Sequence, residues 1–368
     1  MKRKAAAALL MAVSLAGCVP TNIIDDILMV EAEGYDYLGN GRVYGTVTMP
    51  NYVAGGAQGA GGGGVPTTAA MMWLAEGATY DGKSLVDKFQ SKGQRPLRVG
   101  KLRVMLFDKE YAKHGLKKQI EFRNRDPDTA RDLYLAVVDG SANKLLSGKY
   151  QTAIPISRYV SDMIDQNQNQ NYPTNDAHDV FFSYYGNYMD PFMPMIKKRG
   201  KHLEMQGLAL FKKDKYALSI PERDAFVFKM LYEPFNQGVY DYEFMPRKHV
   251  ALRNVNARVQ YRVRNGNGAE PDIKAKVSIE GQVRQAAPGT IGEVPIEEIE
   301  DGMEKELEQK AAEMVGKFQK KSIDPLRLGD RVRSFTRRFD GDTWQDRYPN
   351  AHFHCSVQID INQTGISR

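Results

Sequence analysis

Two histidines near the C-terminus have the spacing of possible metal ligands. His352 and His354 alternate along a strand-like segment, so their side chains face the same way and could begin a zinc site. Cys355 faces the opposite side of that segment, and no third ligand is evident in the sequence. Because the other histidines are scattered singly, we expect surface or packing roles here and no metal.

A glycine-rich run at residues 55–64 contains the spacing G-x-G-x-x-G, which formally matches a dinucleotide-binding fingerprint. Pro66 follows it, where a helix should open onto the pyrophosphate. Farther on, Gly82-Lys83-Ser84 lacks the earlier glycine of a phosphate-binding loop. The chain also has no G-x-S-x-G or H-E-x-x-H motif. We therefore predict a flexible glycine loop, no cofactor and no enzyme active site.

The cysteine with the clearest chemistry is Cys18. It ends a short N-terminal apolar run that follows three basic residues. A transmembrane helix needs about 20 apolar residues, so this shorter run indicates the core of a signal peptide. Leu15-Ala16-Gly17-Cys18 has the lipobox pattern, in which the cysteine thiol takes a diacylglyceryl thioether. We predict that residues 1–17 are removed and that Cys18 carries a lipid. The alternative is a secretory signal whose cleavage site happens to precede a cysteine.

Charge and cysteine content limit the class of the mature protein. The chain has 51 basic and 45 acidic residues, a net charge of +6, and three of the basic residues lie in the predicted signal. Without a dense basic stripe, we expect no nucleic-acid partner. Only Cys355 remains after lipidation, so no internal disulfide is available. With about 350 mature residues, the chain should form two or three domains.

Strand and helix patterns are mixed along the chain without a regular β-α-β alternation. Residues 26–33 and 42–49 flank a Gly-Asn-Gly turn, which predicts a hairpin. Val255–Arg264 and Asp272–Arg284 alternate with period two around a second turn and predict a longer hairpin. Leu133–Val138 is an apolar run typical of a buried strand. The predicted class is α+β.

The clearest helix pattern covers Ile296–Lys320. Its apolar residues recur at helical spacing, with glutamates in the first turn and lysines in the last, as the helix dipole favours. We expect its charged face to be solvated. The Gln/Asn tract at residues 167–171 is likewise predicted to be a solvated loop.

A change in composition at Gly200 and Lys201 gives the best domain boundary. We predict an N-terminal α+β domain at residues 18–200, a small middle domain at 201–250 and a C-terminal domain at 251–368. These two to three mixed α/β domains should contain antiparallel sheets flanked by helices. The whole body should be lipid-anchored.

Aromatic residues are unusually dense between Phe181 and Phe192, including Tyr184, Tyr185 and Tyr188. One reading is a core helix that ends at the Asp190-Pro191 turn. The other is a docking surface for a membrane partner, because aromatic residues are enriched at protein interfaces. The density exceeds what one helical face buries, so Tyr184, Tyr185 and Tyr188 are candidate interface residues.

The order of several short segments resembles the Ger(x)C family of spore-germination lipoproteins over essentially the whole mature chain. Arg125-Asp126-Pro127 followed by Leu133–Val138 is the most specific similarity. The other matching segments, besides the lipobox, are Ile24-x-Asp26, Gly34-x-Asp36, Gly100–Phe107, Gly207–Lys215 and Thr364-Gly365-Ile366.

The resemblance implies a role, a place and partners. Members of that family are C subunits of nutrient germinant receptors. They are non-catalytic, lie on the outer face of the spore inner membrane and accompany integral membrane A and B subunits. Two alternatives come from other classes. A solute-binding lipoprotein of an uptake system would need two similar lobes around a cleft, and a lipoprotein hydrolase would need a nucleophile and a base.

Replacing the lipidated cysteine tests the anchor. Each buried acyl CH₂ contributes about 0.8 kcal/mol, so two or more long chains hold a protein firmly at a membrane. We expect Cys18→Ala to leave an uncleaved precursor or a protein released from the membrane fraction, seen by fractionation and intact mass. A variant that keeps the processed mass and stays in the membrane fraction would contradict the lipobox interpretation.

Overall fold

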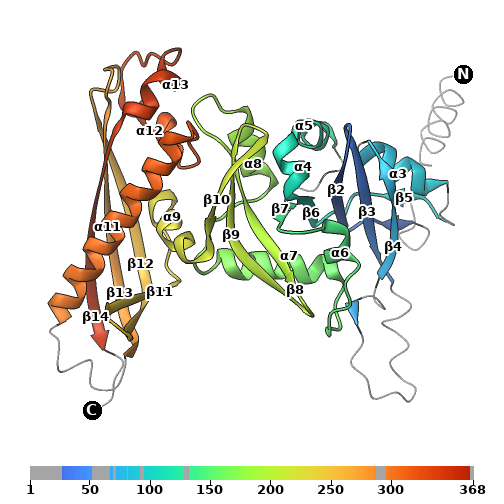
Figure 1. Cartoon of the computed structure of the whole chain (residues 1–368), viewed down its shortest axis with the longest axis horizontal. Coiled ribbons are helices and arrows are strands. Elements are labelled where there is room, and N and C mark those ends of the chain that lie inside the picture. Colours follow the sequence, from blue (N-terminus) through green and yellow to red (C-terminus); the bar gives the residue numbers. More distant parts are fainter. Residues whose placement is uncertain are drawn as a thin grey trace, which may run out of the picture.

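The computed structural model describes residues 27–51, 67–68, 72–80, 82–91, 95–127, 129, 132–286 and 296–364. The molecule is elongated, with a large sheet in its N-terminal part and a small sheet in its C-terminal part (Figure 1). Cys18 and the glycine-rich run at 55–64 lie outside the described residues. No helix of the described part is both long enough and apolar enough to span a bilayer.

The large sheet has eight strands in the order β10-β9-β8-β7-β6-β2-β3-β4. The strands are β2 (Ala32–Gly39), β3 (Arg42–Pro50), β4 (Met72–Thr79), β6 (Val104–Asp108), β7 (Tyr134–Val138), β8 (Phe192–Arg199), β9 (His202–Lys212) and β10 (Lys215–Pro221). A separate two-stranded ribbon joins β1 (Leu28–Met29) to β5 (Leu97–Arg98).

Helices cover both faces of the large sheet. One face packs against α6 (Ala142–Leu146) and α7 (Ile156–Gln168). The other packs against α3 (Gly82–Gln90), α4 (Lys109–His114), α5 (Lys117–Arg125) and α8 (Ala177–Tyr185). Because strand side chains alternate between faces, the apolar run of β7 supplies both cores, Leu135 to one and Ala136 to the other. The predicted buried strand is thereby confirmed.

The centre of the large sheet is parallel, unlike the antiparallel sheets that the sequence predicted. The pairs β2–β6, β6–β7 and β7–β8 all run in the same direction. Each parallel step needs a crossover connection, and helices α4 to α8 lie in those between β6, β7 and β8. The mixed α/β class itself is confirmed. The antiparallel hairpin β2–β3 has the predicted turn, with Gly39, Asn40 and Gly41 at positive φ, and the predicted second strand. Its first strand is Ala32–Gly39 and not residues 26–33, because the strand continues up to the turn.

The small sheet has the order β11-β12-β13-β14. Its strands are β11 (Val239–Met245), β12 (Lys248–Arg264), β13 (Asp272–Ala286) and β14 (His352–Thr364). The predicted long hairpin is β12–β13, and β14 runs parallel to β13. Its helices are α9 (Ala225–Tyr232), which follows the 3₁₀ turn Glu222–Asp224, α11 (Ile296–Lys320), α12 (Leu328–Phe335) and α13 (Trp344–Arg347), which leads into the 3₁₀ turn Tyr348–Asn350. The bounds and the buried stripe of α11 match the prediction.

The charged face of α11 is not wholly solvated, contrary to the expectation. Glu300, Glu304 and Glu308 accept hydrogen bonds from the backbone N–H groups of β14, at 2.7, 2.7 and 2.9 Å. Four residues along a helix rise about 6 Å, close to the advance of two residues along a strand. The glutamates therefore form a ladder along the edge of the small sheet.

Acidic residues of β2 and of the segment before it fix three helices of the N-terminal part. The Glu31 carboxylate accepts a bond of 2.7 Å from Ser157 of α7. Asp36 accepts the backbone N–H groups of Ala142 and Asn143 at 2.7 and 2.8 Å, which positions the start of α6. Gly34 lies beneath α6, where an added Cβ would come within 2.8 Å of Leu146. The segment Gly34-x-Asp36 thus positions α6 against the large sheet.

The predicted domain boundary falls inside the large sheet. Gly200 and Lys201 form the turn between β8 and β9, which pair with each other. Residues 201–250 then supply β9 and β10 to the large sheet and β11 to the small one. The division into domains at residues 200 and 250 stays a prediction. One apolar core cluster includes residues of both the large sheet and the small sheet.

A buried ion pair gives a stability test of the N-terminal part. Glu33 and Arg123 have side chains 0% and 1% exposed and form a close ion pair, which Asp126 extends at 3.3 Å. Glu33→Gln should cost about 3 kcal/mol or more in urea unfolding, because it leaves the Arg123 charge buried with a weaker partner. Glu110→Gln, which removes the exposed pair with Lys113, is the matched control and should be nearly neutral. Equal effects of the two changes would contradict this role.

Candidate functional site

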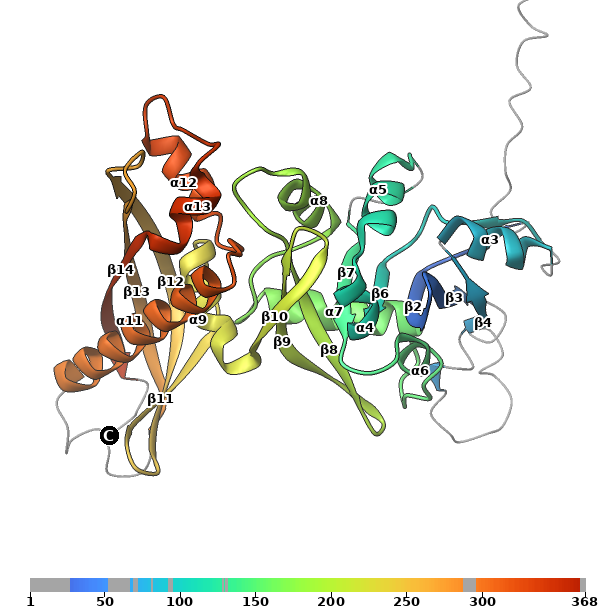
Figure 2. The same cartoon turned by 45° about the horizontal axis from the view of Figure 1, so that its top comes forward.

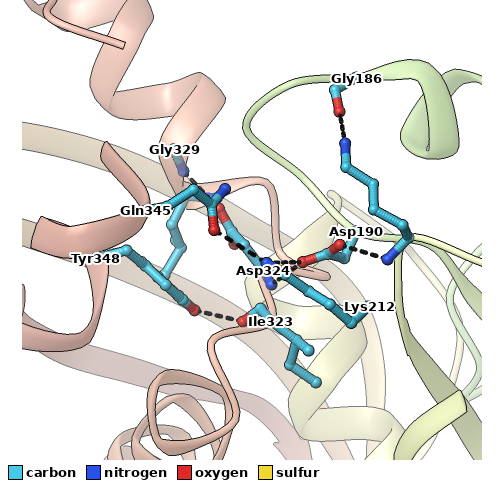
Figure 3. Close-up of polar contacts among 10 residues, drawn as sticks. Gly186, Asp190, Lys212, Ile323, Asp324, Gly329, Gln345 and Tyr348 are labelled. Atoms are coloured by element: carbon cyan, nitrogen blue, oxygen red, sulfur yellow. Dashed lines mark hydrogen bonds and ion pairs between the residues drawn. The ribbon is translucent and has the colours of Figure 1, made fainter. Parts of the chain in front are cut away.

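Two Asp-Pro segments meet where the N-terminal and C-terminal parts of the chain join. Asp190-Pro191 leads into β8, and Asp324-Pro325 lies between α11 and α12. The backbone N–H of Asp190 donates to the carbonyl of Asp324 at 2.9 Å, and the N–H of Asp324 donates to the Asp190 carboxylate at 2.9 Å (Figure 3). These reciprocal bonds bring together residues 134 positions apart.

Each aspartate also organises its own surroundings. Asp324 accepts the N–H groups of Leu328 and Gly329 at 2.8 and 2.6 Å, so its carboxylate caps the first turn of α12. Asp190 accepts the N–H of Lys213 at 2.8 Å, which fixes the turn between β9 and β10. Both carboxylates are almost fully buried. A buried carboxylate is costly unless it is hydrogen-bonded, and these two bind backbone groups from both parts of the chain.

Two lysines of the β9–β10 turn surround Asp190. The Lys212 ammonium lies 3.3 Å from the Asp190 carboxylate and donates to Gln345 at 3.0 Å (Figure 3). The Lys213 ammonium donates to the carbonyl of Gly186. Burial lowers the pKa of Lys213. The turn residues that resembled the spore-germination family therefore link the loop before β8 to α13.

Burial raises the pKa of the Asp324 carboxyl to about 7. The two N–H groups of α12 and the Lys212 ammonium oppose this shift, and the Asp190 charge adds to it. The hydroxyl of buried Tyr348 donates to the neighbouring Ile323 carbonyl at 2.9 Å and closes that side. The arrangement is suited to holding two parts of a chain together and leaves neither carboxylate open to a substrate.

Two arginines, Arg327 just before α12 and Arg331 within it, extend the junction across its surface. The Arg327 guanidinium lies over the rings of Phe182 and Tyr232, at 5.3 and 5.0 Å, and bonds to Asp179 at 3.4 Å. Arg331 lies 4.0 Å from the ring centroid of Tyr261. An open pocket here is lined by Thr174, Asp179, Tyr232, Glu233, Arg327 and Arg331. Its charges are mixed: Arg327 pairs with Asp179, and Arg331 donates to the Tyr232 carbonyl at 3.1 Å.

The structure separates the three predicted interface tyrosines. Tyr188 packs edge-on against Phe339 at 5.2 Å and lies close to Gly329, so it belongs to the junction. Tyr184 is partly buried against the core of the N-terminal part. Tyr185 is 50% exposed at the end of α8. The dense aromatic segment therefore has both internal and exposed members.

The remaining chemical candidates are not assembled into a site. His352 and His354 are exposed and lie near Glu270 and Asp272, at 3.7 and 4.0 Å. Cys355 faces inward, and burial raises the pKa of its thiol to about 12. Among the described residues, no group of three or more possible metal ligands occurs. The reading of these histidines as surface residues agrees with their exposure.

Sequence reasoning named Asp190-Pro191 only as a turn and missed Asp324. A sequence signal did exist, because two of the three Asp-Pro pairs in the chain, Asp190-Pro191 and Asp324-Pro325, lie beside apolar residues. Proline biases the residue before it toward extended backbone. Nothing local indicated that the two pairs would meet.

The raised pKa of Asp324 predicts a pH-dependent stability. The folded chain holds the Asp324 proton up to about pH 7, whereas the unfolded chain loses it near pH 4. This group therefore destabilises the fold progressively as pH rises from about 4 to 7. Asp324→Asn cannot ionise, so its unfolding free energy relative to wild type should improve by about 1 kcal/mol or more between pH 5 and pH 8. A difference that does not change with pH would contradict this reading.

Two protein-family models match the chain end to end. The model described as "Spore germination protein N-terminal domain" covers residues 20–198. The model described as "Spore germination B3/ GerAC like, C-terminal" covers residues 206–365. The gap between them, residues 199–205, contains the turn between β8 and β9, so both models contribute strands to the large sheet.

Similar proteins agree with these models. Spore germination protein GerQC of Bacillus cereus is 29% identical over 98% of both chains. Spore germination protein KC of Bacillus subtilis (strain 168) is 23% identical over 100% of this chain and 97% of its own. The crystal structure of the GerBC protein shares the fold, with a TM-score of 0.59 and 13% identity over 90% of this chain and 97% of that one. Since the two family models together match most of its length, the chain belongs to the GerAC-like (Ger(x)C) family of spore germination proteins.

Proposed function

We propose that this protein is the lipid-anchored C subunit of a nutrient germinant receptor. The observation that carries the proposal is the match of the whole chain, through both domains, to spore germination proteins. In this role it accompanies the integral membrane A and B subunits on the outer face of the spore inner membrane. It contributes assembly or signalling rather than catalysis.

The non-catalytic part of the proposal is supported by how the buried charges are used. Asp190 and Asp324 are the most suggestive acid pair, yet their oxygens bind backbone N–H groups at the junction. The Glu33 carboxylate is likewise occupied by Arg123 and Tyr35. These groups hold elements together and are not available to move protons on a substrate.

The membrane attachment is proposed to run through the lipid on Cys18. Ile27, the first described residue, lies nine positions after Cys18. A fully extended chain of that length spans about 30 Å. The tether would therefore keep the β1–β5 end of the molecule close to the membrane.

The proposed contact with the membrane subunits uses the exposed part of the Phe181–Phe192 segment. Tyr185 and Phe182 are each 50% exposed. Tyr184 and Tyr188, the other two candidates, are partly buried within the fold. We therefore assign the direct contact to Tyr185, with Tyr188 holding the junction behind it.

The alternative of a solute-binding lipoprotein is not favoured. That function requires two similar lobes around a ligand cleft. Here one part is built on an eight-stranded mixed sheet and the other on a four-stranded sheet with a covering helix (Figure 2). The two parts share one apolar core cluster at their junction.

Complementation of a deletion strain tests the function and the contact together. Spores without the gene should lose germination with some nutrients, and the wild-type chain should restore it. Tyr185→Ala should melt like wild type but lose co-purification with the membrane subunits, since an interface anchor typically contributes about 2 kcal/mol or more, a roughly thirtyfold effect. Tyr188→Ala, the matched control, should lower the melting temperature instead.

Normal germination of the deletion spores with every nutrient tested would overturn the receptor role. Undiminished co-purification of a stable Tyr185→Ala protein would move the contact elsewhere and leave the receptor role standing.

A further inference from the structure

The two edge strands of the small sheet, β14 and β11, differ in how their outward-facing backbone groups are hydrogen-bonded. At the β14 edge, the glutamate ladder of α11 takes the N–H groups of Val357, Ile359 and Ile361. These are the donors that another strand would need, so the helix closes this edge. At the opposite edge lies β11, and within the described part of the chain no strand pairs with its outer side. Figure 1 shows β11 at the border of the small sheet.

The backbone N–H and carbonyl of Val239, the first residue of β11, are both hydrogen-bonded on the outer side of the strand. The N–H of Val239 donates to the side-chain oxygen of Asn171 at 2.9 Å, and the Asn171 side-chain amide donates to the Val239 carbonyl at 2.9 Å. The Gln/Asn tract at residues 167–171 is therefore not the solvated loop that was predicted: α7 continues to the buried Gln168, and Asn171 bonds to β11 as a neighbouring strand would. The Val239 backbone thus points away from β12.

Within the residues that the structure describes, the next two positions of the same kind have no backbone partner on their outer side. In an antiparallel pair, every second residue points its N–H and carbonyl the same way. Asp241 and Glu243 follow Val239 at this spacing and pair with Ala251 and His249 across the strand. Their backbone groups therefore face the free side. The inward residue Tyr240 is buried and donates to Glu306 of α11 at 2.5 Å, which holds the strand in place.

The side chains at this edge are apolar at the ends and acidic between them. Val239 and Met245 are 41% and 43% exposed. The side chains of Asp241 and Glu243 are 65% and 53% exposed, with His249 lying 3.4 and 4.0 Å from their carboxylates. An incoming strand would meet open hydrogen-bonding groups beside two negative charges.

We propose that the β11 edge is a docking site for an extended, basic segment of a partner protein. The segment adds as a fifth strand, bonds to the backbone of Asp241 and Glu243, and places lysine or arginine beside their carboxylates. A second copy of this chain fits less well, because antiparallel self-pairing centred on Tyr242 would set Asp241 opposite Glu243 of the other copy. Like charges directly opposite each other destabilise a sheet.

A peptide of alternating lysine and valine is the probe for the full chain in detergent. We expect it to bind, and we expect N-methylation of alternate backbone nitrogens to weaken binding at least tenfold in fluorescence polarisation. Asp241→Pro removes one outward N–H without breaking the ladder and should weaken binding similarly. Asp241→Asn with Glu243→Gln keeps the backbone and should weaken it severalfold at low salt. Asp360→Asn, an exposed acid on β14, is the charge control and should change nothing.

Each contrary result is decisive. Equal binding by the N-methylated peptide would show attraction to surface charge alone and overturn strand addition. Unchanged binding by the Asn–Gln variant, which keeps every backbone donor, would overturn the choice of a basic partner. A dimer in sedimentation that Asp241→Pro converts to monomer would make a second copy the occupant and refute the proposed partner class.

Discussion

The placement of the C-terminal part on the N-terminal part depends on two buried aspartates that bind each other's backbone. A carboxylate removed from water must recover its lost hydrogen bonds, and Asp190 and Asp324 recover theirs from three different turns or helix ends. The backbone N–H groups that bind the two carboxylates come together only when the two parts of the chain are packed in this arrangement. The apolar residues beneath, Phe192, Phe228 and Phe318, contribute burial but little direction. The polar pair therefore supplies specificity, and the rings supply most of the favourable free energy.

In the N-terminal part, too, buried polar side chains fix the positions of elements that pack through apolar contacts. Glu31, Glu33 and Asp36 lie close together along the sequence, and each binds a different helix. Because side chains along a strand alternate between the two faces of the sheet, Glu33 and Asp36 of β2 direct helices on opposite sides, α5 and α6. Gly34 adds the close approach that lets α6 rest on β2. The acidic residues between Glu31 and Asp36 thus fix the positions of α5, α6 and α7 on the sheet.

The sequence patterns predicted the features that depend on residues close together in the sequence. The stripe of α11 and the turns of the two long hairpins depend on residues near in sequence, and the structure reproduces them. The parallel centre of the large sheet, the Asp190–Asp324 pair and the glutamate ladder depend on residues far apart, so periodicity could not reveal them. The aromatic segment was ambiguous for the same reason. Whether Tyr188 is internal is decided by Phe339, which lies 151 positions away in sequence.

The contrast between the sheet edges follows from the same preference of backbone groups for partners. The β14 edge receives three carboxylates from a helix whose residue spacing matches that of the strand. The β11 edge receives a single side-chain amide, from Asn171. The NH₂ group and the oxygen of this one amide both bond to Val239, so it satisfies a single residue and cannot extend along the strand as a helix does. Among the described residues, no strand bonds to the backbone of the next outward-facing positions, so a strand of suitable charge could pair there. Closing one edge with a helix therefore confines any strand addition to the other.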